Sequence, residues 1–511
     1  MARRPVGFAL VGLAIAGATA AAVATSRPWP ERLPLHLALL VGAGLLWALA
    51  IALLPRLRRG RGEAAVLVAI ALLVRLPAWL APPAHSSDVW RYAWDGRVLR
   101  AGINPYRFAP TDPALAPLRE GATPTEGDRA GPERPTPVDG PLFARLNHRD
   151  LPTIYPPGAQ LAFLLAASLP LPALAGIKLV LGAADLGVLA ALIALLRLRR
   201  GDVRAAAAWG WSPLVAVELG QNAHLDALPL LAATAALLAW EARRPALAGL
   251  LLGAATATKL VTAPLLLPLR SARAWVAATA VMLALALPFV VGPWGAGARV
   301  AGSTGEFARR WRGNDGAFAL LQAGAERLAC RAIVAADGTP CAPLDLRRHP
   351  SLARAITGRD SRTAVYPDEL AGFAARSLVA LAIAALAIAL AVRRAPPETA
   401  MEWLLGALVL LTPALHPWYA TWLVPLVALR RRPAWIALAA LAPLGYVPLA
   451  GWLAGGPWRD PIWTRAVEHG AAWTLLLADA LVERAARRRA RRRDERLAGE
   501  LDPDRSRATI R

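Results

Sequence analysis

Long apolar runs recur along this chain, separated by short stretches rich in arginine, proline or glycine. The runs lie near residues 5–25, 34–54, 63–81, 174–196, 205–220, 225–241, 274–292, 371–392, 399–415, 417–429, 434–454 and 466–484. A helix of about 20 apolar residues crosses the ~30 Å hydrocarbon core of a bilayer. The pattern therefore predicts an all-α polytopic membrane protein with about 12 transmembrane helices.

Two further apolar segments do not fit a simple crossing. Residues 156–171 lie between a predicted external loop and a span that must end inside, so we expect a re-entrant or interfacial helix there. Residues 246–268 are flanked by arginine at both ends, which indicates that both ends face the same side. We therefore expect two half-helices that meet near Thr258 and Lys259, where protein or a water-filled cavity lines the backbone.

The chain carries a net charge of +23, and its arginines cluster at the ends of the apolar runs. These clusters lie at 56–61, 197–204, 243–244, 393–394, 430–432 and 484–496. Such clusters are typical of cytoplasmic loops and also attract anionic lipid, so we predict no nucleic-acid partner. On this map both termini are cytoplasmic. Residues 1–481 form the membrane domain of an inner (plasma) membrane protein, and residues 482–511 form a basic tail.

Two long segments, about 82–155 and 293–370, fall outside on the same map. A loop of this length directly after a span is too long for a connector and is a candidate for function. The only cysteines, Cys330 and Cys341, both lie in the second loop. A disulfide between them is permitted outside the cell, and two free thiols are the alternative.

The first external loop begins with a block of polar and aromatic residues. If residues 88–100 are helical, one face carries Asp88, Arg91 and Asp95, and another carries Trp90 and Trp94. Two interpretations are open. The segment is an interfacial helix with tryptophans at headgroup level and an exposed ion pair, or it presents its carboxylates and arginine to a cleft.

Polar residues also recur at the predicted outer ends of other spans. They are Gln221 to Asp226, His416 to Tyr419, Trp311 to Asp315 and Tyr155 to Pro157. Any one of these stretches is more typical of a turn than of a site. Because an active site gathers its polar residues on one face, their shared location predicts a site at the external membrane surface.

Lysine is nearly absent from the chain. Of 58 basic residues only Lys178 and Lys259 are lysines, and both lie inside apolar segments. Intramembrane cations are costly and are usually paired or functional. Asp185 follows Lys178 by two helical turns, so we expect a structural pair there. Lys259 has no evident carboxylate partner, which makes it the better candidate for a phosphate contact.

The block from Ser87 to Tyr106 resembles bacterial polyprenol-phosphomannose-dependent mannosyltransferases of the glycosyltransferase-C superfamily. It resembles, more distantly, the first mannosyltransferase of GPI-anchor assembly. The resemblance continues in order through residues 155–160, 177–185, 222–226, 257–260 and 416–419, so it covers about residues 60–430.

The resemblance implies a glycosyltransferase-C-like fold and an inverting transfer on the extracytoplasmic face. A hexose, and by this resemblance mannose, would pass from a polyprenyl-phosphate donor to a hydroxyl of a glycolipid or glycan acceptor. Asp88 would be the base, with Asp95 as the alternate. Arg91 or Lys259 would stabilise the leaving phosphate. The other candidate substrate contacts are Tyr92, Asn104, Tyr106, Tyr155, Asn222, His224, Asp226, Asn314, His416, Trp418 and Tyr419.

We expect neither a cofactor nor a metal, because the leaving group is a lipid-carried monophosphate. The chain has no phosphate-binding P-loop, dinucleotide-binding glycine pattern, Cys/His metal spacing or Gly-x-Ser-x-Gly turn. Two other functions remain as alternatives. A transporter or flippase of lipid-linked sugars predicts polar residues through the membrane depth, and an oligosaccharide polymerase or ligase predicts its large catalytic loop in the later half of the chain.

Overall fold

The computed structural model describes residues 6–27, 31–57, 60–120, 141–334, 338, 340–359 and 362–500, without the side chains of 302 and 491–500. Within these ranges the protein is helical apart from one two-stranded antiparallel sheet. It is an all-α polytopic membrane protein, as the apolar pattern predicted.

The N-terminal part contains α1 (Val6–Ala24), α2 (Leu33–Leu53), η1 (Leu54–Arg56), α3 (Glu63–Leu80), α4 (Asp88–Arg100), η2 (Pro113–Arg119), η4 (Leu142–Arg145), α5 (Pro157–Ser168) and α6 (Ala173–Leu198). The middle contains η5 (Val203–Ala206), α7 (Ala207–Gly210), α8 (Pro213–Val215), the π-helical η6 (Ala216–Gln221), α9 (Ala227–Glu241), α10 (Pro245–Thr258), η7 (Leu260–Leu269) and α11 (Ala272–Val290).

The C-terminal part contains η8 (Gly297–Ala301), α12 (Gly302–Arg310), α13 (Gly316–Ala332), β1 (Leu344–Asp345), α14 (Pro350–Thr357), β2 (Ala364–Val365) and α15 (Pro367–Val392). It continues through α16 (Pro397–Leu411), η9 (Pro417–Leu423), α17 (Val424–Arg430), α18 (Pro433–Leu441), η10 (Ala442–Tyr446), α19 (Pro448–Leu453) and α20 (Ile462–Glu500).

Seven of the described helical segments are long and apolar enough to cross a membrane. They are Val6–Ala24, Leu33–Arg56, Glu63–Leu80, Ala173–Leu198, Ala272–Val290, Pro367–Val392 and Pro433–Leu453. Some of the other predicted spans are composite. Residues 205–220 are divided among η5, α7, α8 and η6, and residues 417–429 between η9 and α17. The total of about twelve spans therefore stays a prediction.

Helices α10 and α11 approach closely because small residues face each other. A Cβ added at Gly249 would lie 2.0 Å from the carbonyl oxygen of Ala274, and one at Gly253 would lie 2.6 Å from that of Ala278. Membrane helices pack through such small-residue contacts, since lipid supplies no hydrophobic force between them. The close approach fixes α10, whose C-terminal end lies at the site described below.

The interruption predicted near Thr258 and Lys259 is confirmed. Helix α10 ends at Thr258, Lys259 is extended (φ −151°, ψ 119°), and η7 begins at Leu260. The break leaves Lys259 on non-helical backbone between α10 and η7.

The expected ion pair between Lys178 and Asp185 is wrong. Asp185 instead makes a bidentate pair with Arg75, with Nε–Oδ2 at 2.6 Å and Nη2–Oδ1 at 2.8 Å, and all of these groups are fully buried. Lys178 donates to three carbonyl oxygens at the end of α3, those of Ala78, Trp79 and Ala81. Helical spacing placed Lys178 and Asp185 on one element, but the partner of each comes from α3.

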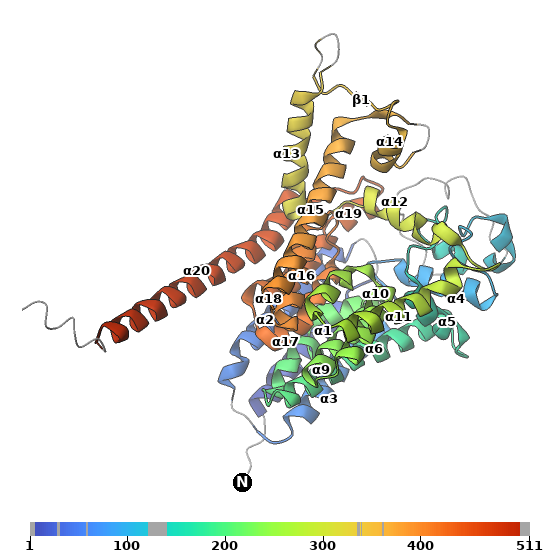
Figure 1. Ribbon diagram of the computed structural model, residues 1–511. Coiled ribbons are helices and arrows are strands. Elements are labelled where there is room, and N and C mark those ends of the chain that lie inside the picture. The colour runs from blue at the N-terminus through green and yellow to red at the C-terminus, as the bar shows by residue number, and fades with distance from the viewer. Residues whose placement is uncertain are drawn as a thin grey trace, which may run out of the picture.

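A helical extension stands clear of the bundle at the top of Figure 1, formed by α13, α14, the β1–β2 pair and the start of α15. It carries a disulfide between Cys330 and Cys341, which confirms that option over two free thiols. Helix α20 extends away from the body toward the lower left of the same view. Helices α4 and α5 lie toward the right edge of the same view.

Candidate active site

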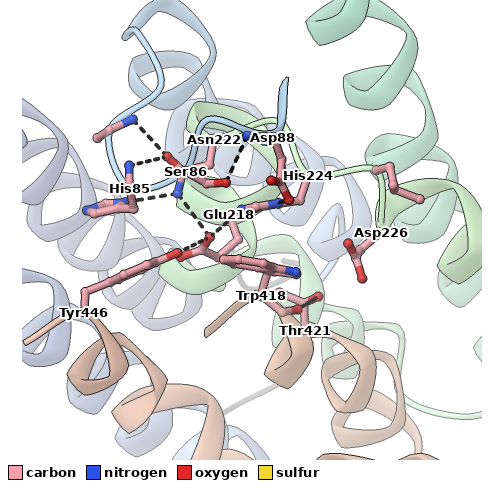
Figure 2. Close-up of polar contacts among 12 residues, drawn as sticks. His85, Ser86, Asp88, Glu218, Asn222, His224, Asp226, Trp418, Thr421 and Tyr446 are labelled. Carbon is pink, nitrogen blue, oxygen red and sulfur yellow. Dashed lines mark hydrogen bonds and ion pairs between the residues drawn. The ribbon is translucent and has the colours of Figure 1, made fainter. Parts of the chain in front are cut away.

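Several of the predicted polar stretches meet in one cluster (Figure 2). The cluster is formed by the start of α4, the turn between η6 and α9, the end of α10, η9 and η10. It brings together Asp88, Asn222, His224, Asp226, Lys259, His416, Trp418 and Tyr419. We call this set, together with Glu218, the polar cluster.

Asp88 is the first residue of α4, where a helix N-terminus favours a negative charge. Its Oδ1 accepts a hydrogen bond from Asn147 Nδ2 at 3.2 Å, and its Oδ2 is 3.8 Å from Nδ1 of His224. The side chain is 24% exposed. Asp88 is therefore anchored on two sides and still accessible on a third.

His224 is fully buried and lies flat against Trp418, with ring centroids 3.9 Å apart. The preceding Ala223 has φ +54°, a left-handed conformation that is costly for a residue with a Cβ. This turn directs the imidazole into the cluster, where Nε2 is 3.4 Å from Oε2 of Glu218. Neither ring nitrogen of His224 makes a well-aligned hydrogen bond among the described residues.

Glu218 is a functional candidate that sequence reasoning missed. It is completely buried, and its Oε2 accepts hydrogen bonds from Tyr446 at 2.9 Å and Asn222 Nδ2 at 3.1 Å. It lies in the π-helical turn η6, a geometry often found at functional sites. The signal available in the sequence was a carboxylate inside an apolar run, which is costly and usually functional.

A chain of hydrogen bonds leads from Asn222 into the bundle. Oδ1 of Asn222 accepts from the backbone N–H of Ala84 and His85, so its Nδ2 faces Nδ1 of His85 at 3.0 Å. Nε2 of His85 is 2.8 Å from Nε2 of His36, whose Nδ1 faces the carbonyl of Ala22 at 2.7 Å. Because a carbonyl only accepts, Nδ1 of His36 donates to Ala22 and its Nε2 accepts from Nε2 of His85. Nδ1 of His85 then accepts from Nδ2 of Asn222.

This series of hydrogen bonds requires a neutral His85. Burial, and then the neighbouring imidazoles of His36 and His224, hold the pKa of His85 well below its usual range. Its ring also stacks on Tyr446, with centroids 4.4 Å apart. The loop between α3 and α4 is thus fixed by an uncharged network directly ahead of Asp88.

The expectation that Lys259 lacks a carboxylate partner is wrong. Its Nζ is 2.6 Å from Oδ1 of Asp226, which also accepts from Nε1 of Trp422 at 2.5 Å. The ammonium lies over the rings of Tyr419 and Trp422, at 4.8 and 5.0 Å from their centroids. The partner was in one of the predicted polar stretches, but only the fold brings the two segments together.

Three residues of the polar cluster, His416, Trp418 and Tyr419, form an aromatic wall along one side of it. Trp418 is stacked between His224 and His416, at 3.9 and 4.3 Å, and Tyr419 meets His416 edge-on at 5.3 Å. Trp418 and Tyr419 come from η9, and His416 is the residue before it. Flat aromatic faces beside carboxylates and a cation suit a ligand that has both apolar and polar faces.

Arg91 and Asp95 are buried, so the interpretation of α4 as an interfacial helix with an exposed ion pair is wrong, and of the three polar residues expected on one face only Asp88 lies in the polar cluster. Asp95 is 1% exposed and accepts from Arg91, Thr153 and Gln160. The other nitrogens of Arg91 donate to the carbonyls of His148 and Leu151. The helix is buried on nearly all sides, so the ion pair is not exposed and holds the loop in place instead.

The tryptophans of α4 are also buried, at 8% for Trp90 and 1% for Trp94, and do not form an interfacial belt. Arg145 lies over the Trp90 ring at 4.6 Å. The loop that follows α4 folds back and covers the helix. Helical periodicity in a sequence does not show whether another segment packs on an expected polar face.

Four other predicted contacts support the loop. Asn104 donates to the carbonyls of Phe289 and Trp294, which ties the loop to the end of α11. Tyr106 donates to the carbonyl of Tyr155. Tyr92 stacks on Phe163 at 4.7 Å and meets Tyr155 edge-on at 5.0 Å. Burial, with the nearby Asp88 charge, raises the pKa of Tyr92 and Tyr155 well above the usual range.

Asn314, in the segment between α12 and α13, contacts Glu468 of α20 and the residue that precedes His416. Its Nδ2 donates to Oε2 of Glu468 at 2.8 Å and to the carbonyl of Leu415 at 3.4 Å. Leu415 precedes His416, so Asn314 supports the aromatic wall rather than facing it. His148 of the first loop meets Trp311 of the second, with centroids 4.5 Å apart.

Among the described residues, no group of three or more His, Cys, Asp or Glu side chains is placed to hold a metal ion. The expectation of a metal-free reaction stays a prediction.

Two protein-family models match the chain, each over more than half of its length. The model described as alpha-(1->6)-mannopyranosyltransferase, N-terminal domain, matches residues 6–279. The model of glycosyltransferase family 87 matches residues 153–413. Neither a curated protein nor a solved structure matches. The first match contains Asp88, Glu218, His224 and Lys259, so most of the polar cluster lies inside it.

Proposed function

The chain belongs to the alpha-(1->6)-mannopyranosyltransferase family and to glycosyltransferase family 87, and from this premise we propose the reaction of a mannosyltransferase of the glycosyltransferase-C type in detail. Mannose passes from a polyprenyl-phosphate donor to a hydroxyl of a lipid- or glycan-linked acceptor, with inversion at the anomeric carbon. The reaction takes place on the extracytoplasmic side, to which the positions of the arginine clusters assign α4.

One observation carries the assignment of the base. Three carboxylates lie in the polar cluster, and their side chains are 24% exposed for Asp88, 0% for Glu218 and 1% for Asp226. A general base must reach the proton that it removes. Asp88 is thus the carboxylate that takes the proton from the acceptor hydroxyl, and Asp95, buried and bonded to three side chains, is the scaffold beneath it.

Lys259 is assigned to the leaving phosphate. Its side chain is 21% exposed, and an ammonium has three donors, of which the contact with Asp226 uses one. The Asp226 carboxylate and the rings of Tyr419 and Trp422 hold the cation in place when no phosphate is bound. As the bond from the anomeric carbon to the phosphate breaks, charge develops on that oxygen, and a fixed cation stabilises it.

The aromatic wall is assigned to the sugar. His416 and Tyr419 are partly exposed and offer ring surface on which the apolar side of a hexose packs, and Trp418, stacked between His224 and His416, holds the wall in place. Family membership and one localised cluster favour transfer over transport of a lipid-linked sugar. An oligosaccharide polymerase or ligase predicts its catalytic loop late in the chain, and it is disfavoured because the accessible carboxylate of the polar cluster, Asp88, comes from the earlier loop.

The test is transfer by the purified protein in detergent or vesicles, with polyprenyl-phosphomannose as donor and cell-envelope glycolipids as acceptors. Asp88→Asn is expected to lower kcat by about 100-fold or more, because general base catalysis contributes that much. Asp150→Asn is the matched control, since Asp150 is an exposed carboxylate in the same loop. Full activity of Asp88→Asn would refute the assignment, and no transfer by wild type would refute the proposed function.

A further inference from the structure

His224 lies between two carboxylates that differ in exposure (Figure 2). Its Nδ1 is 3.8 Å from Oδ2 of the accessible Asp88, and its Nε2 is 3.4 Å from Oε2 of the buried Glu218. Stacking on Trp418 fixes the ring plane. The imidazole therefore connects a group that reaches substrate with one that does not.

Glu218 is placed beside His224 in the buried part of the cluster. Among the described residues, His224 is the only basic side chain within ion-pair distance of it. Its Oε1 has no hydrogen-bond partner there. A buried carboxylate without a cation is costly, so a proton arriving on the neighbouring imidazole is stabilised by it.

The hydrogen bonds indicate which nitrogen of His224 carries the proton at rest. Oε2 of Glu218 accepts from Tyr446 and Asn222, so its negative charge is fixed on the Nε2 side of the ring. A carboxylate only accepts, which favours the proton on Nε2 and leaves the lone pair of Nδ1 facing Asp88.

We propose that Asp88, His224 and Glu218 form a proton relay for the transfer reaction, an inference that rests on the proposed function. The acceptor oxygen bonds to the anomeric carbon as the bond from that carbon to the phosphate oxygen breaks, and the phosphate keeps the electron pair. The hydroxyl proton passes to Asp88, then to Nδ1 of His224, while the proton on Nε2 moves to Glu218.

The relay restores Asp88 as a carboxylate within the transfer step, and before the next turnover the proton returns from Glu218 through His224 to Asp88, whose exposed side releases it to solvent. One proton leaves the acceptor hydroxyl and one arrives on Glu218, so the count balances. Asp88 is the catalytic residue because it touches substrate, and His224 and Glu218 are positioning residues that act through it. The arrangement places the transferred proton on the far side of the ring from the sugar.

The decisive variant is Glu218→Gln. The amide keeps the shape of the side chain, and its oxygen still accepts from Tyr446, Asn222 and Nε2 of His224, but an amide does not take up the proton that leaves Nε2. We expect kcat to fall by about 100-fold or more with an unchanged donor KM. Tyr446→Phe is the comparison variant. It removes one hydrogen bond to the same oxygen and leaves the contact with His224, so its loss in kcat should stay below about 10-fold.

Equal losses in the two variants would mean that Glu218 has only a structural role, and would overturn the relay. A second measurement needs no variant. Single-turnover rates of wild type in mixtures of H2O and D2O should follow a bowed curve, since two protons move together, and a straight line would overturn the relay. If wild type transfers mannose and Glu218→Gln matches it, the relay fails and the proposed function stands. If wild type is inactive with the lipid donor, both fail.

Discussion

Lys259 and Asp226 hold each other at the end of α10, and their contact joins segments 33 residues apart. The pair keeps a cation at the border of the cluster without a bound anion. Because Trp422 also donates to Asp226, the carboxylate stays in place when the lysine turns toward a phosphate. We therefore expect donor binding to depend on this one charge more than on the abundant arginines.

Lys259→Gln is predicted to raise the KM for the lipid-phosphate donor by about 10- to 100-fold, which corresponds to losing a hydrogen bond to a charged group. Steady-state transfer at several donor concentrations measures it. Arg270→Gln is the control, since it removes an exposed positive charge at the opposite end of η7. A similar rise for Arg270→Gln would show that the effect is general attraction to the anionic donor.

At the same scale, the sequence predicted which polar stretches meet but not which residues pair. Asp88, His224 and His416 were selected from their positions at the ends of apolar runs, and the fold brings them together. Arg91 and Asp95 were misjudged because spacing shows that two residues share a face without showing what packs on it. Glu218 was missed because its significance arises from Tyr446, a contact 228 residues away.

Elements were easier to predict than pairs. The helix expected over 88–100 has those bounds. The break at Lys259 occurs where it was predicted from the arginines that flank residues 246–268 at both ends. The π-helical turn η6 was not expected, since a single wide turn leaves no periodic signal in a run of apolar residues. It is nevertheless the turn that places Glu218 and Asn222 on one side.

The close contact between α10 and α11 gives a prediction at the element scale. Gly249→Ala places a Cβ where the carbonyl of Ala274 already lies, so the helices must separate, at a cost of about 1–3 kcal/mol. The midpoint of thermal unfolding in detergent should fall. Gly324→Ala is the matched control, because that glycine lies in α13 with open space around it and alanine favours helix.

For the whole molecule, the orientation in the membrane determines where the reaction takes place. The disulfide between Cys330 and Cys341 is typical of a non-cytosolic compartment. In Cys330→Ser, we expect the exposed Cys341 to react with a membrane-impermeant maleimide in cells whose outer envelope layers are permeabilised while the plasma membrane stays intact. In Cys330→Ser/Cys341→Ser/Arg484→Cys, the thiol on α20 should react only after lysis. Reaction of Cys341 only after lysis would place the polar cluster in the cytoplasm.

The bidentate pair of Arg75 and Asp185 has a consequence for biosynthesis. The two residues are 110 positions apart, so the ribosome has added the segment that contains α4 and α5 before the carboxylate exists. A guanidinium has no stable position alone in hydrocarbon. The third span is therefore expected to remain beside the translocon until the sixth helix emerges, and the two leave for the lipid together.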